Sequence, residues 1–237
     1  MRLSLALLLL SVLVSLACEN VITRKYEYEE EVFLALDGSA TVHVNASVPA
    51  LVALRGFKLP LDPSARLDRM VVRDLYNTPV SSVESVTLSR KEGRRYVHLR
   101  LDVPDIRRLH EGLPFAWSTY RYLEGDASFE FGQDITAAAG HDVGNVGWNG
   151  DELIAVRVHL PSVVTDQNSP SRKVERGNIV VWEQPLAERL KGTPLEIQAS
   201  MEKESILFRT LALFGAMAVL AAATFVGFIW FVKTRKA

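Results

Sequence analysis

The residues best suited to chemistry gather in one stretch, GHDVGNVGWNGD, which runs from Gly140 to Asp151. Its glycines predict a backbone that enters the positive-φ region and approaches another group closely. Its spacing does not match an EF-hand loop, and no glutamate closes it as a bidentate ligand. Three interpretations stay open: an inter-strand loop covered by Trp148, a loop that contacts a partner or lipid through Trp148, and a metal site. The oxygen ligands of that metal site, of the kind calcium takes, would come from Asp142, Asn145, Asn149 and Asp151.

A second group is cationic. Arg66, Arg69 and Arg73 fall within about 60° of one another on a helix predicted over 63–76. Three arginines on one edge could bind lipid phosphates or a membrane surface, where each cation contributes ~1 kcal/mol. Asp68 and Asp74 would weaken the local positive field, so an ordinary solvated face is the alternative interpretation.

Familiar catalytic motifs are absent from the sequence. It contains no G-x-S-x-G, H-E-x-x-H, P-loop or dinucleotide fingerprint. His43, His98 and His159 fall on predicted strands, and His110-Glu111 lacks the second histidine of a zinc helix. We therefore predict no catalytic residue and no cofactor. A membrane-tethered, metal-dependent hydrolase that uses the 140–151 loop is kept as the alternative.

The N-terminus is typical of an exported protein. After Arg2, the 15 residues from Leu3 to Ala17 carry no charge. As a helix they would reach only ~22 Å, short of the ~30 Å hydrocarbon core, so 1–17 is predicted to be a signal peptide. Cys18, the only cysteine of the chain, follows a cleavage site with small residues at −3 and −1. This stretch resembles the bacterial lipoprotein signal, which implies that Cys18 is lipidated and begins the mature chain.

The C-terminus predicts a membrane span. Residues 211–232 are 22 uncharged residues, which as a helix cover ~33 Å. Lys233, Arg235 and Lys236 follow, so the tail 233–237 is predicted to be cytoplasmic and the domain 18–205 exoplasmic. The segment from Glu19 to Thr210 contains 28 acidic and 23 basic residues. Its net charge of −5 disfavours nucleic acid as a partner.

The elements that must position these groups are mostly strands. Apolar alternation and turn residues predict three hairpins, which turn at 37–39, 91–94 and 125–126. A helix over 63–76, capped by Asp62, a short helix over 105–110 and strands over 152–160, 178–184 and 194–200 are also expected. The acidic run Glu27, Glu29, Glu30 and Glu31 is interpreted as facing water. The predicted fold class is α+β: mostly antiparallel sheet with one longer helix packed on it, plus a C-terminal transmembrane helix.

Several of these features together resemble one protein family. A lipoprotein-type cysteine precedes ALDGSATVHV, and GNIVVWEQPLAERLKGTPLEIQA leads toward the predicted span, with Asn178, Trp182 and Gly192 inside it. The chain in this respect resembles the LppM-like lipoproteins of bacterial envelopes. The resemblance implies a compact α+β ectodomain that contacts lipids or glycolipids without catalysis.

These observations favour a non-catalytic envelope lipoprotein anchored in the bacterial cytoplasmic membrane, with a single span and an N-terminal lipid. Its exoplasmic domain is expected to bind a lipid, a glycolipid or a membrane-protein partner. Arg66, Arg69, Arg73 and Trp148 are the candidate ligand-binding residues, and no nucleic acid is expected among the partners.

Overall fold

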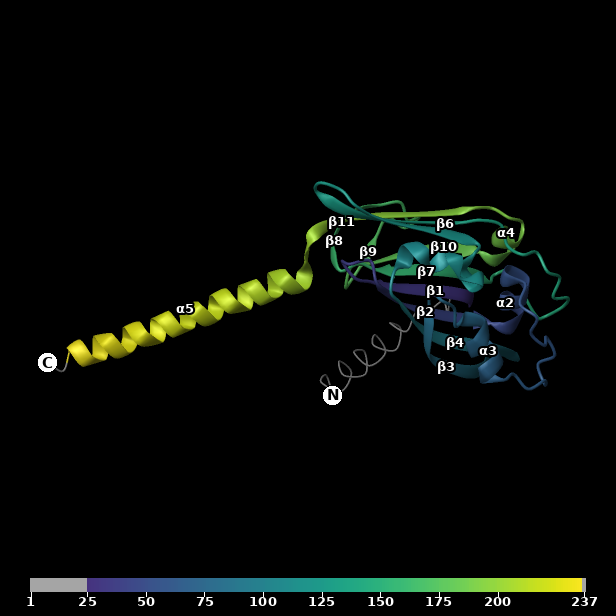
Figure 1. The fold of residues 1–237 in the computed structure, drawn as a ribbon, viewed down its shortest axis with the longest axis horizontal. Coiled ribbons are helices and arrows are strands. Elements are labelled where there is room, and N and C mark those ends of the chain that lie inside the picture. The colour runs from purple at the N-terminus through teal and green to yellow at the C-terminus, as the bar shows by residue number, and fades with distance from the viewer. Residues whose placement is uncertain (1–24, 236–237) are drawn as a thin grey trace, which may run out of the picture.

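The structure is a computed structural model that describes residues 25–235, without the side chains of residues 206, 209, 232 and 233. The predicted signal peptide 1–17, Cys18 and the last two residues of the basic tail lie outside the described residues. Two β-sheets form the folded domain, and a long helix extends from it (Figure 1).

The strands divide unequally between the two sheets. The larger sheet has the order β3 (Ser82–Lys91), β4 (Arg94–Val103), β2 (Ala40–Ser47), β1 (Tyr26–Leu34), β7 (Leu153–His159), β10 (Ile179–Pro185) and β9 (Val174–Glu175). The smaller has the order β5 (Ser118–Glu124), β6 (Ser128–Ile135), β11 (Leu195–Ser205) and β8 (Ser162–Gln167). The pairing of β1 with β7 is parallel, and the other pairings are antiparallel. The α+β class is confirmed, although the strands form two sheets where one was expected.

The three predicted hairpins are confirmed, and their turns follow from local chemistry. In the β1–β2 turn, the Asp37 carboxylate accepts the Ser39 N–H at 2.9 Å and Gly38 has a φ of 86°. In the β3–β4 turn, Glu92 and Gly93 have φ values of 50° and 77°. Two consecutive positive φ angles give a two-residue turn whose twist matches that of the flanking strands.

The space between the sheets is filled by apolar side chains and closed at one end by α2 (Val48–Arg55). Ser47 caps this helix by accepting the Ala50 N–H at 3.1 Å, and Gly56 ends it with a φ of 70°. Every residue of α2 except Arg55 is buried. The sequence pattern does not predict α2, because an almost uniformly apolar helix shows no 3.6-residue period. The short strands β8 and β9 were not predicted either.

The predicted helix over 63–76 is wrong in its first half. Helix α3 (Arg69–Tyr76) begins only after Asp68, which accepts the Met70 N–H at 2.8 Å. Asp62 instead caps a tight turn, in which its carboxylate accepts the Ser64 N–H. The buried face of α3 is formed by Val72 and Tyr76, whereas Met70 and Val71 are exposed. The short helix near 105–110 is a 3-10 helix over Ile106–Glu111, followed by another over Leu113–Phe115.

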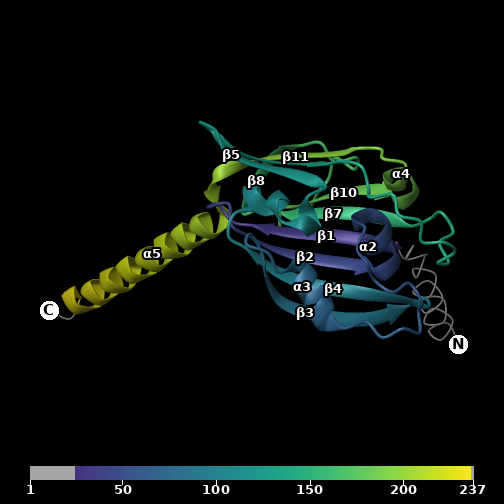
Figure 2. The same cartoon turned by 45° about the vertical axis from the view of Figure 1, so that its right-hand side comes forward.

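Helix α5 (Ile206–Thr234) continues β11 without a loop between them. Its segment Thr210–Phe231 is 22 residues long, apolar and exposed, and is long enough to cross a membrane. A last short helix, α4 (Leu186–Leu190), follows β10. Both views of the ribbon show α5 leaving one end of the domain, whereas α2 and the loop between β6 and β7 lie at the other end (Figures 1 and 2).

Candidate functional site

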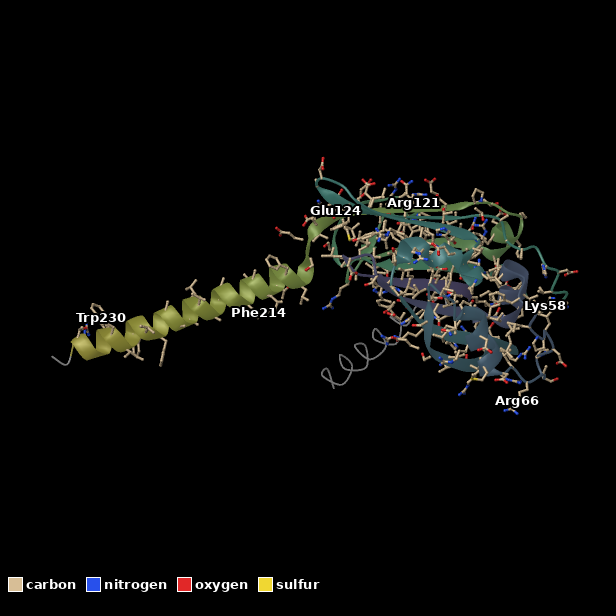
Figure 3. The ribbon with its side chains drawn as sticks, in the orientation of Figure 1. Lys58, Arg66, Arg121, Glu124, Phe214 and Trp230 are labelled. Atoms are coloured by element: carbon tan, nitrogen blue, oxygen red, sulfur yellow. The ribbon has the colours of Figure 1, made fainter. Side chains whose placement is uncertain are left out.

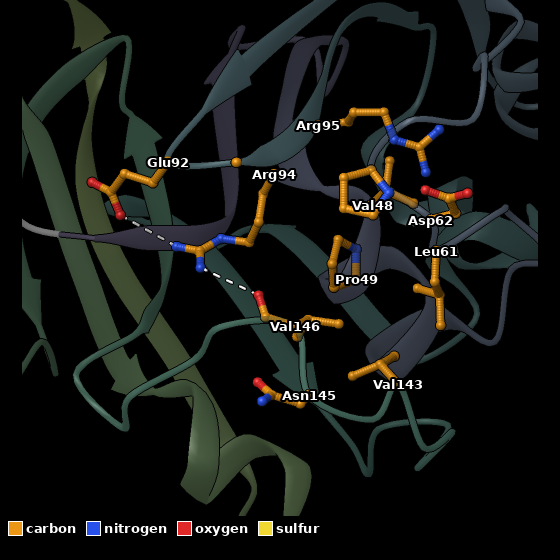
Figure 4. A pocket seen from close by; sticks show the side chains of 12 residues that line it. Val48, Pro49, Leu61, Asp62, Glu92, Arg94, Arg95, Val143, Asn145 and Val146 are labelled. Carbon is orange, nitrogen blue, oxygen red and sulfur yellow. Dashed lines mark hydrogen bonds and ion pairs between the residues drawn. The ribbon is translucent and has the colours of Figure 1, made fainter.

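A cavity of about 400 Å³ lies at the end of the domain that carries α2 (Figure 4). The start of α2, the segment 61–63, the β3–β4 turn and the β6–β7 loop contribute its walls. Mostly apolar cavities of this size, with a few polar groups, are typical of small-molecule sites. The apolar lining residues are Val48, Pro49, Leu61, Pro63, Val143 and Val146.

Arg94 joins the β3–β4 turn to the other walls of this cavity. Its guanidinium lies 3.0 Å from the fully buried Glu27 carboxylate and 3.4 Å from Glu92. It also donates to the Gly147 carbonyl at 3.0 Å, which holds the β6–β7 loop against the turn. Burial would lower the pKa of Arg94, but the contacts with Tyr96, Glu27 and Glu92 outweigh it and raise that pKa. Arg94 is therefore a structural clamp with its charge compensated inside the protein.

Arg95 holds the opposite wall. It donates to the carbonyl of Ala65 at 2.7 Å and to that of Pro60, and so keeps the 60–65 segment out of helical conformation. Its side chain is buried, and its Nε–H has no acceptor in the described part of the chain. Burial lowers the pKa of Arg95, and the positive charge of Arg90 lowers it further.

The loop singled out by the sequence, 140–151, forms one wall of the cavity through Val143, Asn145 and Val146. Its glycines at 140, 144, 147 and 150 all have positive φ, as predicted. Three of the four proposed ligand side chains accept hydrogen bonds within the loop: Asp142 accepts the Gly144 N–H, Asn145 that of Gly147 and Asn149 that of Asp151. Within residues 25–235, no group of three or more His, Cys, Asp or Glu side chains is arranged to hold a metal ion.

The end of this loop is fixed by Glu152, which the sequence analysis did not single out. Its carboxylate accepts the N–H groups of Asn149 at 2.9 Å and of Gly150 at 2.8 Å. Burial would raise the pKa of Glu152, but these hydrogen bonds, together with the backbone N–H of Glu152 and the positive charge of Arg94, outweigh burial and hold the pKa below its usual range. Trp148 is half-buried and packs against the core. This arrangement agrees with the interpretation that Trp148 covers the loop.

The three arginines chosen from the sequence do not share a helix edge. Arg66 precedes α3, and Arg69 is exposed in its first turn. Arg73 lies on α3 but donates to the Val83 carbonyl at 2.6 Å, which attaches the helix to β3. Figure 3 shows Arg66 at the end of the domain opposite to α5, the same end as the cavity.

The acidic run of β1 also differs from its predicted role. Glu27 and Glu30 are fully buried, whereas Glu29 and Glu31 are half-exposed. The two-residue period of a strand places alternate side chains on the inner face, and an irregularity between Tyr26 and Tyr28 adds Glu27 to the buried ones. That period was the signal that could have identified Glu30 as buried, whereas the burial of Glu27 and its pairing with Arg94 follow from the irregularity.

Comparison with known proteins gives a likeness of fold. A search of solved structures matches the NMR structure of the folded domain of LppM from Mycobacterium tuberculosis, at a TM-score of 0.41 and 13% identity. The match covers 78% of this chain and 94% of that chain. No protein-family model and no curated protein sequence matches the chain.

Proposed function

We propose that this chain is a non-catalytic envelope lipoprotein, whose exoplasmic domain binds a lipid, a glycolipid or a membrane-protein partner. The observation that carries the proposal is the cavity beside α2. Its walls are mostly apolar, and each of the polar side chains that line it already bonds to the protein: Asp62, Glu92, Arg94, Arg95 and Asn145. Such a cavity suits the binding of an apolar group better than general acid–base chemistry, which needs side chains available to the substrate.

Membrane attachment is the second part of the proposal. The signal peptide 1–17 is removed, Cys18 carries lipid, and α5 crosses the bacterial cytoplasmic membrane with the tail 233–237 in the cytoplasm. The apolar length of Thr210–Phe231, the basic tail and the resemblance of the sequence to LppM-like lipoproteins support this topology.

Two measurements test the topology. A reporter that is active only in the cytoplasm, fused after Ala237, should be active, because the basic tail stays inside. Metabolic labelling with a fatty acid should be lost in Cys18→Ala, while the protein stays membrane-bound through α5. Unchanged labelling would show that Cys18 is not the lipidation site.

Occupancy of the cavity tests the binding function. The full chain, extracted from membranes in a mild detergent, should carry a co-purifying amphiphile that native mass spectrometry detects. Val143→Trp fills the cavity and should reduce that occupancy at least tenfold. Val163→Trp, at an exposed position of β8 in the smaller sheet, is the matched control and should retain the ligand. Equal occupancy in both variants would contradict the proposal that the ligand binds in this cavity. Hydrolytic turnover that Asp142→Ala abolishes would show that the protein is an enzyme rather than a binding protein.

A further inference from the structure

The β3–β4 hairpin places like charges opposite one another near its turn. Arg90 pairs in register with Arg95, and Lys91 pairs with Arg94. Directly opposed side chains on neighbouring strands lie about 4.5–5.5 Å apart at Cβ, and like charges in such pairs are destabilising. A hairpin that retains two cationic pairs in succession therefore needs compensating negative charge from elsewhere.

The two pairs are compensated differently. Arg94 has the carboxylates of Glu27 and Glu92 within 3.4 Å. For Arg90 and Arg95, by contrast, no carboxylate lies within 4.0 Å in the described part of the chain, and the same holds for Arg66. Asp62 is the acidic group whose field reaches Arg95. Its carboxylate is exposed and already accepts the N–H and hydroxyl of Ser64.

These three arginines, which have no carboxylate within 4.0 Å among the described residues, line one hollow. Arg66, Arg90 and Arg95 surround a cavity of about 280 Å³, together with Ser89 and the apolar Leu67 and Leu88. Among residues 25–235, no acidic residue lines it. Arg95 is buried, its Nε–H has no acceptor in that same range, and it also lines the larger cavity beside α2. The cationic hollow and the apolar cavity are thus neighbours that share Arg95 as a lining residue.

We propose that Arg66, Arg90 and Arg95 bind a phosphate group, and that this phosphate belongs to an amphiphile whose apolar part enters the cavity beside α2. The inference deepens the proposed binding function and rests on it. Guanidinium groups match the oxygen geometry of phosphate and form short, charge-assisted hydrogen bonds with it. A bound phosphate supplies the negative charge that the Arg90–Arg95 pair lacks. The exposed Arg66 and Arg90 contact the phosphate from the solvent side. Arg95 contacts it at the junction between the head group and the apolar part of the amphiphile.

This site differs from the cationic edge expected from the sequence. Arg66 is shared, but its partners come from the β3–β4 hairpin rather than from α3. Arg73 is engaged with the carbonyls of β3, and Arg69 does not line the hollow. Arg69 therefore provides a matched control: an exposed arginine, three residues from Arg66, whose removal changes the total charge by the same amount.

The experiment uses the full chain in micelles of an uncharged detergent and three soluble probes. The probes are inorganic phosphate, dihexanoyl phosphatidate, which carries both phosphate and chains, and dihexanoylglycerol, which carries the chains alone. Isothermal titration calorimetry should show phosphatidate binding at least tenfold more tightly than either of the other two. Arg90→Gln and Arg66→Gln should each weaken phosphatidate binding about tenfold, and Arg69→Gln should leave it unchanged. Raising the salt concentration should weaken binding to the wild type more than to Arg90→Gln.

Each other outcome decides against a defined part of the proposal. If inorganic phosphate binds as tightly as phosphatidate, and Arg90→Gln abolishes both, the ligand is a free phosphate and the amphiphile is wrong. If dihexanoylglycerol binds as well as phosphatidate, and Arg90→Gln has no effect, the phosphate site is wrong while the proposed binding function stands. If none of the probes binds, the phosphate site is overturned, and the occupancy of the native protein alone then decides the proposed function. If Arg69→Gln weakens phosphatidate binding as much as Arg90→Gln does, the binding depends on the general surface charge and the specific phosphate site is wrong.

Discussion

Two regions of this domain hold charged groups in unfavourable surroundings: one buries a carboxylate, and the other places two arginines opposite each other. The two regions differ in whether the protein itself supplies the compensating partners. Between the sheets, the Glu30 carboxylate is fully buried. It accepts hydrogen bonds from Tyr120 at 2.8 Å, Gln133 at 3.0 Å and Tyr28 at 3.1 Å. At the β3–β4 turn, Arg90 and Arg95 are opposed in register, and no carboxylate lies within 4.0 Å of either in the described residues.

The interior group is satisfied by the protein itself. Arg55 adds a positive charge near Glu30, and its guanidinium lies 4.0 Å from the ring centre of Trp117. Burial raises the pKa of Glu30, and the hydrogen bonds and Arg55 oppose that rise. Because its partners come from both sheets and from α2, this cluster ties the layers together. Arg90 of the β3–β4 hairpin makes no such connection between the layers, and the positive charge of Arg90 and Arg95 is left for a ligand to neutralise. A buried polar cluster whose groups bond to one another stabilises the fold, whereas a charged cluster that lacks such partners can bind a ligand.

The largest expected effect is that of Glu30→Leu. The change leaves two tyrosine hydroxyls and the Gln133 amide without their buried acceptor, and it leaves Arg55 without its nearby negative charge. Removing one partner of a buried charged network costs about 3–5 kcal/mol. Thermal and urea unfolding of the full chain in detergent should measure the loss. Glu31→Leu, at the next position but on the outer face, should cost only about 0–1 kcal/mol. Equal losses of unfolding free energy in the two variants would show that the buried partners of Glu30 do not stabilise the fold more than those of the half-exposed Glu31 do.

The second prediction concerns pH. The pKa of Glu30 is raised in the folded protein, so the folded state binds more protons than the unfolded state above the ordinary value of about 4.3. Its contribution to stability is therefore fully present below that value and is lost as pH rises through the raised pKa. In Glu30→Gln this contribution is absent. The stability of the variant relative to the wild type should increase from pH 4 toward pH 7, and a difference that does not change with pH would contradict the raised pKa.

The smallest effect has the opposite sign. Arg90→Gln removes one member of an opposed cationic pair, and we expect it to stabilise the phosphate-free protein by about 0.2–1 kcal/mol. Added dihexanoyl phosphatidate should raise the melting temperature of the wild type more than that of the variant at the same concentration, because the variant binds it about tenfold more weakly. A loss of stability in the phosphate-free Arg90→Gln protein would mean that Arg90 is structural, like Glu30.

Much of the secondary structure could be predicted because it depends on neighbours in the chain. The three hairpins follow from two-residue alternation and from turn residues such as Asp37-Gly38 and Glu92-Gly93. The helix start at 63 was mistaken because Asp62 and Pro63 serve equally well in a tight turn. The long-range bonds from Arg95 to Pro60 and Ala65 decide between the two.

The candidate site was predicted only in part. The 140–151 loop was identified from its glycines and does form a wall of the cavity. Arg66 was also identified, but Arg90, Arg94 and Arg95 were not, because arginines on both strands of a hairpin near its turn are typical of a solvated surface. The role of Arg94 depends on Glu27 of β1, which lies 67 positions earlier in the chain and on the far side of β2 in the sheet.

The sequence by itself determined the local conformations and the apolar segment Thr210–Phe231, since turn chemistry, strand period and continuous hydrophobicity act over a few residues. Only the tertiary structure decided the parallel pairing of β1 with β7, the separation of the strands into two sheets and the burial of Glu27. It also decided which arginines share a hollow. These features depend on contacts between residues far apart in the chain, and the free energy of such contacts comes from burial and charge compensation that no local pattern records.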